Sequence, residues 1–285
     1  MIITVIALLL FFFIIIMVLD GNRFRVVSYE ISHEKIKKPY TFVVLSDLHN
    51  KVYGKNHEKL IRAIEKEQPA GVLIAGDLLT AKPGYPLHLA LDLLEQLAPK
   101  YPIYYGMGNH EARLFLYPEV YGTMGADYEE KLKGLGISLL RNESRSLGED
   151  LVITGLDMKR EYYKRFKKTT MTTEYLKKTL GEKNKDKFQI LLAHHPDYFQ
   201  EYSSWGADLV LSGHVHGGMV RLPFLGGVIS PALRLFPKYD GGSFEEKESR
   251  MILSRGLGMH TIPIRIFNPG ELISIKLSPK EHNSI

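Results

Sequence analysis

Residues 40–49 read Y-T-F-V-V-L-S-D-L-H, an apolar run that ends at two side chains typical of metal sites, Asp47 and His49. The uninterrupted apolar stretch over 40–45 predicts a strand with both faces buried, as in the interior of an α/β sheet. Behind it, apolar residues between 56 and 68 recur at the spacing of one helix face. This part of the chain therefore predicts a strand, a polar loop and a helix in succession.

The same order of elements continues along the chain. A second strand is predicted over 70–75 and ends at Gly76-Asp77, a helix over 87–98, and a third strand over 101–105. Later strands follow one another more closely, at 137–140, 151–156, 188–193, 208–211, 251–254 and 271–277. An alternating first half and a strand-rich second half together predict two stacked mixed sheets flanked by helices, a four-layer α/β/β/α sandwich.

A segment without charge, Ile2–Leu19, precedes this pattern, and Thr4 is its only polar residue. As a helix rising about 1.5 Å per residue it spans about 27 Å, close to the hydrocarbon thickness of a bilayer. No small-x-small cleavage site follows and no basic residue precedes it, which favours an uncleaved transmembrane anchor over a cleaved signal peptide. We expect an anchor over 1–20, a linker over 21–39 and one folded domain over 40–280.

The bulk composition limits the chemistry without choosing a substrate. The 285 residues include no cysteine, which excludes disulfides, Cys-ligated zinc and thiol catalysis. The net charge of +5 favours anionic partners but is too small to predict a specific nucleic acid, and no obligate protein partner is evident. Basic residues follow the apolar segment and none precedes it, so the positive-inside rule places the domain in the cytoplasm. These residues are Arg23, Arg25, Lys35, Lys37 and Lys38.

Residue types that bind divalent metals occur after predicted strands at five places. Because the carboxyl ends of strands in an open α/β sheet meet at one crevice, we expect these side chains to gather there. Imidazole and carboxylate groups without sulfur suit Mn²⁺, Fe or Zn²⁺. Each segment alone is weak evidence, but all five in order predict a metal centre. The segments are Asp47-Leu48-His49, Gly76-Asp77, Gly108-Asn109-His110-Glu111, His194-His195 and Gly213-His214-Val215-His216-Gly217.

The number of candidate ligands favours two metal ions. A single ion needs about four to six ligands, and the set is larger than that. Asp77 is the only carboxylate of its segment, and a bridging carboxylate is the usual means of holding two ions about 3.5–4 Å apart. A hydroxide shared between the ions would be a nucleophile at neutral pH.

The ordered pattern D-x-H, G-D, G-N-H-E, H and G-H-x-H resembles the calcineurin-like metallophosphoesterase superfamily over about residues 40–278. Further on, G-H-V-H-G-G-M-V-R-L-P at 213–223, S-R-G-L-G at 254–258 and P-I-R at 263–265 resemble its YkuE/YaeI-like bacterial branch of membrane-associated or exported phosphoesterases. This resemblance is compatible with an extracytoplasmic domain, whereas the positive-inside rule predicts a cytoplasmic one. Thr80 is one departure, since many members carry an acid three residues after the bridging Asp.

The resemblance implies a role for each motif residue except Glu111. The metal ligands would be Asp47, His49 and His216 for one ion, Asn109, His194 and His214 for the other, and Asp77 as the bridge. His110 would stand near the leaving-group oxygen, as general acid or as stabiliser of the transition state. The reaction implied is in-line attack on phosphorus by the bridging hydroxide, which hydrolyses a phosphomonoester or phosphodiester.

Three further residues are weaker candidates for substrate contact. His195 follows His194 in His-His-Pro-Asp, where the motif assigns the first His to the metal and leaves the second to the substrate or to the support of a ligand. Arg221 and Arg255 are suited to a substrate phosphate, although an exposed or ion-paired arginine is the simpler interpretation of each.

Residues 159–187 hold eleven Lys or Arg against four acids, with aromatic residues between them. A solvated loop and helix explain this composition. The alternative is a membrane-facing surface that attracts a lipid-linked substrate, such as the pyrophosphate of a nucleotide-glycolipid. A metal-binding scaffold without catalysis is a third hypothesis. The motif set retains every ligand, and this argues against it.

Overall fold

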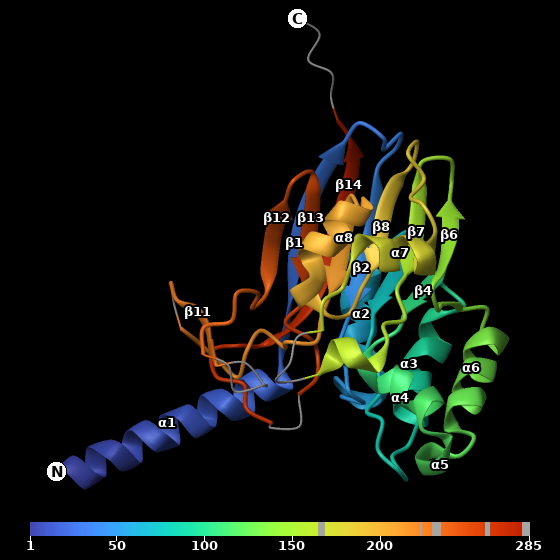
Figure 1. Ribbon diagram of the computed structural model, residues 1–285. Coiled ribbons are helices and arrows are strands. Elements are labelled where there is room, and N and C mark those ends of the chain that lie inside the picture. The colour runs from blue at the N-terminus through green and yellow to red at the C-terminus, as the bar shows by residue number, and fades with distance from the viewer. Residues whose placement is uncertain (165–168, 223, 230–234, 260–262, 281–285) are drawn as a thin grey trace, which may run out of the picture.

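The computed structural model describes residues 1–164, 169–222, 224–229, 235–259 and 263–280 (Figure 1). Within these residues, two six-stranded sheets stack on one another, a two-stranded hairpin lies at one end, and helices cover both outer faces. The predicted four-layer sandwich is therefore confirmed, and a long apolar helix precedes it.

The first sheet has the strand order β1-β14-β2-β3-β4-β5. Strands β2 to β5 run parallel to one another, whereas β14 is antiparallel to β2. The loops that follow β2, β3 and β4 therefore lie side by side at one edge. The strands are β1 (Phe24–His33), β2 (Tyr40–Leu45), β3 (Gly71–Ala75), β4 (Ile103–Gly106), β5 (Ser138–Leu140) and β14 (Gly270–Pro279).

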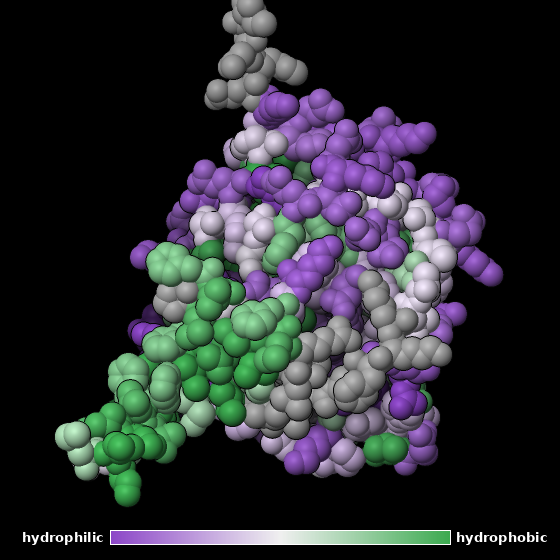
Figure 2. All heavy atoms as spheres, turned by 60° about the vertical axis from the view of Figure 1, so that its left-hand side comes forward, coloured by the Kyte–Doolittle hydropathy of each residue, from purple (hydrophilic) through white to green (hydrophobic). Residues whose placement is uncertain are grey.

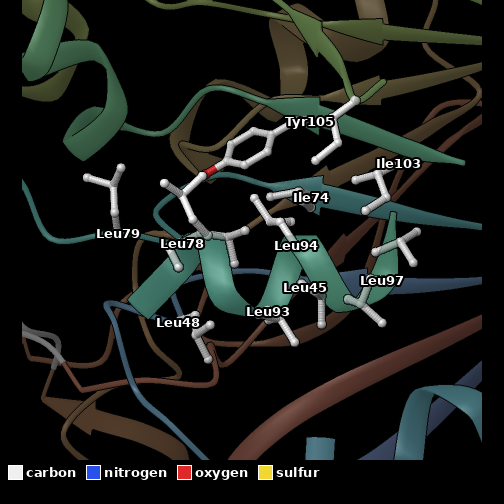
Figure 3. Packing of buried hydrophobic residues seen from close by; sticks show 14 of the residues in the cluster. Leu45, Leu48, Ile74, Leu78, Leu79, Leu93, Leu94, Leu97, Ile103 and Tyr105 are labelled. Carbon is white, nitrogen blue, oxygen red and sulfur yellow. The ribbon is translucent and has the colours of Figure 1, made fainter. Parts of the chain in front are cut away.

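Helices pack on the outer face of this sheet through a continuous apolar cluster. Leu93, Leu94 and Leu97 of α3 belong to the same buried cluster as Ile74 of β3 and Tyr105 of β4 (Figure 3). Such burial fixes the strands beneath the helices, because protein interiors are close-packed. The helices are α2 (Glu58–Lys66), α3 (His88–Leu97), α4 (Asn109–Leu116), α5 (Pro118–Tyr121) and α6 (Met124–Gly134).

The second sheet has the order β12-β13-β9-β8-β7-β6. Phe42 and Val44 of the first sheet share a buried cluster with Ile190 and Leu211 of the second, so the two sheets meet face to face. Helices α7 (Thr173–Leu180) and α8 (Phe199–Trp205) cover its outer face. The strands are β6 (Glu143–Leu147), β7 (Leu151–Gly155), β8 (Phe188–Leu192), β9 (Leu209–Ser212), β12 (Gly242–Glu246) and β13 (Ser249–Leu253).

The segment expected to be a linker, residues 21–39, contains a strand of the first sheet. β1 pairs in parallel with β14 over ten residues, from Phe24 opposite Gly270 to His33 opposite Pro279. It is an edge strand with partly exposed side chains, so its sequence lacks the apolar run that revealed β2. Strands β6 and β12, and the hairpin of β10 (Val220–Leu222) and β11 (Gly226–Ile229), were likewise not predicted.

Helix α1 (Ile2–Asn22) projects from the domain, and none of its most apolar stretch is buried (Figure 1). Its mean hydropathy of 3.4 and its length suffice to cross a membrane. Only the end nearest the domain, at Asp20 and Gly21, is buried. The apolar helix predicted over 1–20 is therefore present, and its end is built into the domain.

Candidate metal centre

The five motif segments meet at the carboxyl ends of the strands. Asp47 follows β2, Asp77 follows β3, His194 follows β8, and His214 follows β9. Three groups of side chains there have ligand atoms that all lie within 4.8 Å of one another. The groups are Asp47, His49 and His216; Asp77, His194 and His214; and His49, Asp77 and His110.

Several of these residues have a backbone conformation that is rare outside glycine. The φ angles are 50° at Asp47, 47° at His49, 55° at Asp77, 75° at His214 and 51° at His216. Left-handed backbone at a non-glycine residue costs of order 1–3 kcal/mol and persists only where surrounding structure imposes it. The fold thus holds these loops in sharp bends, and the bends direct their side chains to one place.

Two motif glycines allow the loops to approach one another. A Cβ atom on Gly108 would lie 2.2 Å from Asp77 Oδ1. A Cβ atom on Gly213 would lie 2.0 Å from Ser46 Oγ and 2.2 Å from Asp47 Oδ2. No side chain fits at either distance, so glycine is needed for close approach to the two carboxylates.

Asp47, His49 and His216 form the first candidate ion site. The Asp47 side chain is buried, and its carboxylate accepts hydrogen bonds from Ser46 Oγ at 2.6 Å and from the His214 backbone N–H at 3.0 Å. The Nε2 atoms of His49 and His216 lie 3.1 Å apart, and are 3.9 Å and 3.4 Å from Asp47 Oδ1. Two imidazole nitrogens and a carboxylate oxygen thus converge on a point suited to a cation.

His194 is held in the tautomer that a metal ligand requires. Its Nδ1 atom lies 2.6 Å from the Ala75 carbonyl oxygen, which accepts only, so Nδ1 carries the proton. In the neutral ring Nε2 therefore has a lone pair, and this atom lies 3.1 Å from Asp77 Oδ2 and 3.8 Å from Asp47 Oδ1. A backbone carbonyl behind the ring is the usual support of a metal-binding histidine. Among the described residues it is His194, not His195, that stands in a ligand group.

Asn109 supplies a further donor beside this group. Its Oδ1 atom is buried and accepts no hydrogen bond from the described residues. A buried amide oxygen normally has a partner, since leaving it without one costs free energy. An oxygen of this kind fits a divalent cation, so the donor set here combines imidazole, carboxylate and amide groups without sulfur.

The electrostatics of the crevice require a positive charge between the carboxylates. Burial raises the pKa of Asp47 to about 6. Burial acts in the same direction on Asp77, but His194 and His110 outweigh it and keep the pKa of Asp77 well below its usual value. For His194 burial is outweighed by Asp77 and Asp47, which raise its pKa to about 10. The carboxylates thus stabilise a cation strongly, whether an imidazolium or a metal ion.

His110 differs from the other histidines in its tautomer. The backbone N–H of Ala81 donates to His110 Nδ1 at 2.9 Å, so the neutral ring carries its proton on Nε2. Burial lowers the pKa of His110, which favours that neutral form. The ring centre is 4.8 Å from that of His49. His110 therefore offers a hydrogen-bond donor at the edge of the cluster.

Glu111, to which the sequence analysis assigned no role, supports the backbone of the loops that carry the cluster. Its buried carboxylate accepts the backbone N–H groups of Asp77 at 2.8 Å, Leu78 at 2.9 Å and Gly108 at 3.1 Å, and the Tyr105 hydroxyl at 2.7 Å. Burial, followed by the nearby Asp77 carboxylate, raises the pKa of Glu111 to about 7. Its bond to Gly108 N–H is the one that the Glu of a capping box makes at the start of a helix, but Gly108 lacks the Ser or Thr by which that motif is recognised in a sequence.

Asn268 supports the opposite side of the cluster and was also missed. Its side-chain N–H₂ donates to the carbonyl oxygens of His216 and Gly218, both at 2.7 Å. Its backbone N–H donates to Asp20 Oδ2 at 2.8 Å, and Arg23 pairs with Asp20 Oδ1 at 2.7 Å. The end of α1 is thereby connected to the loop that carries His216.

The weaker candidates take different positions. The ring of His195 lies 4.4 Å from that of His214, within the same site. Arg221 donates to the Gly217 carbonyl at 2.8 Å and pairs with Asp240 at 3.1 Å, while Arg255 Nε lies 3.9 Å from Glu271 Oε1. Both arginines have acidic neighbours, and their contact with a substrate stays a prediction. Thr80 Oγ1 lies 3.4 Å from His49 Nδ1, so this side chain contacts a candidate ligand.

A cavity of about 370 Å³ opens beside Asn109. Basic side chains and tyrosines share its wall with apolar residues, and the Arg160 guanidinium lies 5.1 Å from the Tyr117 ring centre. The start of the basic stretch, from Arg160 to Lys164, forms one side, while residues 165–168 lie outside the described residues. The lining residues are Asn109, Ala112, Arg113, Leu116, Tyr117, Val120, Tyr121, Met158, Arg160, Tyr163 and Lys164.

Comparison with known proteins agrees with this geometry. The sequence model of the calcineurin-like phosphoesterase family matches residues 40–218. An uncharacterized metallophosphoesterase of Aquifex aeolicus is 30% identical over 264 residues, which cover 90% of this chain and 92% of the relative. The uncharacterized metallophosphoesterase YkuE of Bacillus subtilis is 27% identical over 240 residues, 82% of this chain and 77% of the relative.

Among solved structures, a dimetal phosphatase from Danio rerio aligns with 77% of this chain and 88% of its own, at 14% identity and a TM-score of 0.42. The family match extends over more than half of the chain, and the Aquifex aeolicus relative is similar over nearly its whole length. The chain therefore belongs to the calcineurin-like phosphoesterase family.

Proposed function

We propose that the chain hydrolyses a phosphate ester with two divalent ions. The observation that carries the proposal is the convergence of the buried carboxylates of Asp47 and Asp77 with five histidines, four of which would be ligands. The donor set fits Mn²⁺, Fe or Zn²⁺. Asp47, His49 and His216 would hold one ion, Asn109, His194 and His214 the other, and Asp77 would bridge them.

Two features support Asp77 as the bridge. Its Oδ2 atom lies 3.1 Å from His194 Nε2 and 3.9 Å from His49 Nε2, so one oxygen reaches both groups. Its Oδ1 atom accepts the His110 backbone N–H at 2.8 Å, which fixes the carboxylate orientation. When bound, the two ions supply Lewis-acid polarisation of the phosphate oxygens and lower the pKa of water.

The chain's own residues would position and protonate the substrate. His110 carries a proton on Nε2 and would donate a hydrogen bond from it to the oxygen that leaves phosphorus, which stabilises the negative charge that develops there. Glu111 is a positioning residue, because it holds the backbone of Asp77 and Gly108. The cavity beside Asn109 is a suitable place for the rest of the ester, with Arg113, Arg160 and Lys164 near any second anionic group.

We further propose that α1 anchors the enzyme in the cell membrane. The exposed surface of α1, its length and its mean hydropathy of 3.4 support this role. The charge rule predicts that the domain lies on the cytoplasmic side of the membrane, whereas the YkuE-like resemblance is also compatible with the opposite side. Reactivity of a cysteine introduced at an exposed site, such as Lys178, toward an impermeant thiol reagent in intact cells distinguishes the two.

The test of the catalytic proposal uses the full chain in detergent. We expect about two divalent ions per chain by elemental analysis, and Mn²⁺-dependent hydrolysis of p-nitrophenyl phosphate or bis(p-nitrophenyl) phosphate. The Asp77→Asn variant should lose bound metal and at least about 10²-fold in rate, as expected when a main electrostatic stabiliser is removed. Asp186→Asn, at an exposed loop residue, is the matched control and should keep both the bound metal and the rate of hydrolysis.

The outcomes separate the enzyme from a scaffold. A full chain that binds about two ions yet stays inert on both esters would support the metal-binding scaffold instead. Retention of metal and rate by Asp77→Asn would contradict the proposed bridge.

A further inference from the structure

A group of large apolar side chains is exposed beside the metal centre. We call this surface the apolar lip, and Phe224 in it is fully exposed while Leu225 exposes 62% of its surface. Contiguous exposed apolar surface on a soluble domain marks a site of contact with a partner or a membrane. The lip consists of Leu222, Phe224, Leu225, Leu235, Phe236 and Phe267.

The lip is one connected piece of structure. β10 and β11 form its hairpin, and the Phe236 backbone N–H donates to the Val228 carbonyl at 2.9 Å. On the other side of β10, the Arg221 N–H donates to the Ile266 carbonyl at 3.0 Å, next to Phe267. Backbone hydrogen bonds therefore connect its separate segments.

The lip continues the apolar surface of α1. The rings of Phe13 in α1 and Phe267 in the lip have centres 6.4 Å apart in an edge-to-face arrangement. Figure 2 shows hydrophobic atoms extending from α1 onto the base of the domain without a polar gap in that view. Because Phe267 of the lip lies against Phe13, near the middle of a helix with the composition of a membrane span, hydrocarbon is the occupant that fits both surfaces.

The lip is also joined to the metal centre. β10 begins at Val220, four residues after His216. Asn268 directly follows Phe267 and donates to the His216 carbonyl at 2.7 Å. The surface that contacts hydrocarbon and the loop that carries a candidate metal ligand are therefore adjacent parts of the same structure.

We propose that the apolar lip inserts into the surface of the bilayer that α1 crosses, so that the metal crevice opens at the membrane. The substrate is then a phosphate ester carried on a lipid. The membrane contact stands without the catalytic proposal, whereas the substrate class rests on the proposed function.

Site-specific labelling tests the membrane contact in the full chain. The protein has no cysteine, so Leu225→Cys and Phe236→Cys each create a single site for an environment-sensitive dye. The protein is reconstituted in phosphatidylcholine–phosphatidylglycerol vesicles. Leu10→Cys in α1 provides the hydrocarbon reference, and Glu248→Cys, in the turn between β12 and β13 at the far end of the sheet, provides the water reference.

We expect both lip labels to emit at blue-shifted wavelengths near that of the Leu10→Cys label, and to be quenched by nitroxide-bearing lipids. Emission equal to that of the Glu248→Cys label would overturn the proposal, and so would a Leu10→Cys label that itself reports water. These readings need no activity, so they remain valid if the catalytic proposal fails.

A second measurement tests the substrate class. The Phe224→Ser/Leu225→Ser variant is compared with the unmodified chain on phosphatidic acid in the vesicles and on soluble p-nitrophenyl phosphate. We expect the variant to lose about tenfold on phosphatidic acid and to keep its rate on the soluble ester. Equal rates of variant and unmodified chain on phosphatidic acid, or none by either, would overturn the lipid substrate. An unmodified chain inert on both esters would reject the proposed function and leave the label result intact.

Discussion

Charged side chains are usually exposed and large apolar side chains are usually buried. The metal crevice is an exception to the first rule and the apolar lip is an exception to the second. In the crevice, Asp47 and His194 are almost completely buried, while at the lip Phe224 and Leu225 face outward. A buried carboxylate needs a nearby positive charge, and a large exposed apolar surface favours a contact that removes it from water. Each region thus has the composition of a binding surface. The crevice suits a divalent cation, and the lip suits hydrocarbon.

The two regions are also held differently. The crevice is fixed by strained backbone and by buried hydrogen bonds such as those of Glu111, so its geometry is set before any ligand arrives. The lip rests on a short hairpin with a register shift between Val220 and Arg221. Preorganisation suits chemistry that needs fixed distances, whereas contact with a fluid bilayer does not need them.

The largest effect within the crevice is expected from His110→Asn. If His110 is a donor and not a ligand, kcat on an aryl phosphate ester should fall on the order of 10²–10³-fold while metal content stays unchanged. The measurement pairs steady-state rates with elemental analysis. His88→Asn, at an exposed histidine of α3, is the control. Loss of an ion from His110→Asn would instead place His110 among the ligands.

A large effect on stability is expected from Glu111→Ala. The change leaves the buried N–H groups of Asp77, Leu78 and Gly108 without their acceptor, each at a cost of about 1–3 kcal/mol. We expect the free energy of unfolding to fall by about 3 kcal/mol or more, seen as a lower melting temperature of the full chain in detergent. Glu95→Ala, at an exposed residue of α3, should stay within about 0.5 kcal/mol. Equal melting of the two variants would show that the crevice does not depend on this carboxylate.

A smaller effect is expected where the two regions join. Asn268→Ala removes the donor to the carbonyls of His216 and Gly218, and partners of this kind contribute about 10–100-fold in metal affinity. Titration of the metal-free chain with Mn²⁺ measures the change, with Asn184→Ala at an exposed turn as the control. Unchanged affinity would mean that the crevice and the lip are independent, despite the hydrogen bonds between them.

The predictable part of the fold was the part that is buried on both faces. β2 and β3 are continuous apolar runs because helices cover one side of the first sheet and the second sheet covers the other. β1 and β12 lie at sheet edges with exposed positions, so their sequences, such as Gly-Ser-Phe-Glu-Glu over 242–246, resemble loops. The predicted linker over 21–39 differs from the structure for this reason.

The site was predictable where a motif residue follows a strand directly. Asp47 and Asp77 come two residues after β2 and β3, so strand order alone brought them together. The roles of Glu111 and Asn268 depend on backbone groups that approach them only in three dimensions; Asn268 and His216 are 52 positions apart. The ion pair of Arg221 with Asp240 likewise depends on a loop geometry that the sequence does not encode in any local pattern.

Because Asp20 is buried in the domain, the exact position of a proteolytic cut near the end of α1 matters for more than release from the membrane. Cleavage on the far side of Asp20 would shed a domain that keeps the carboxylate to which the Asn268 backbone donates. Cleavage only a few bonds later, beyond Asn22, would shed a domain without it, and the loop of His216 would lose part of its support. Release from the membrane and loss of this support are therefore separated by less than one helical turn.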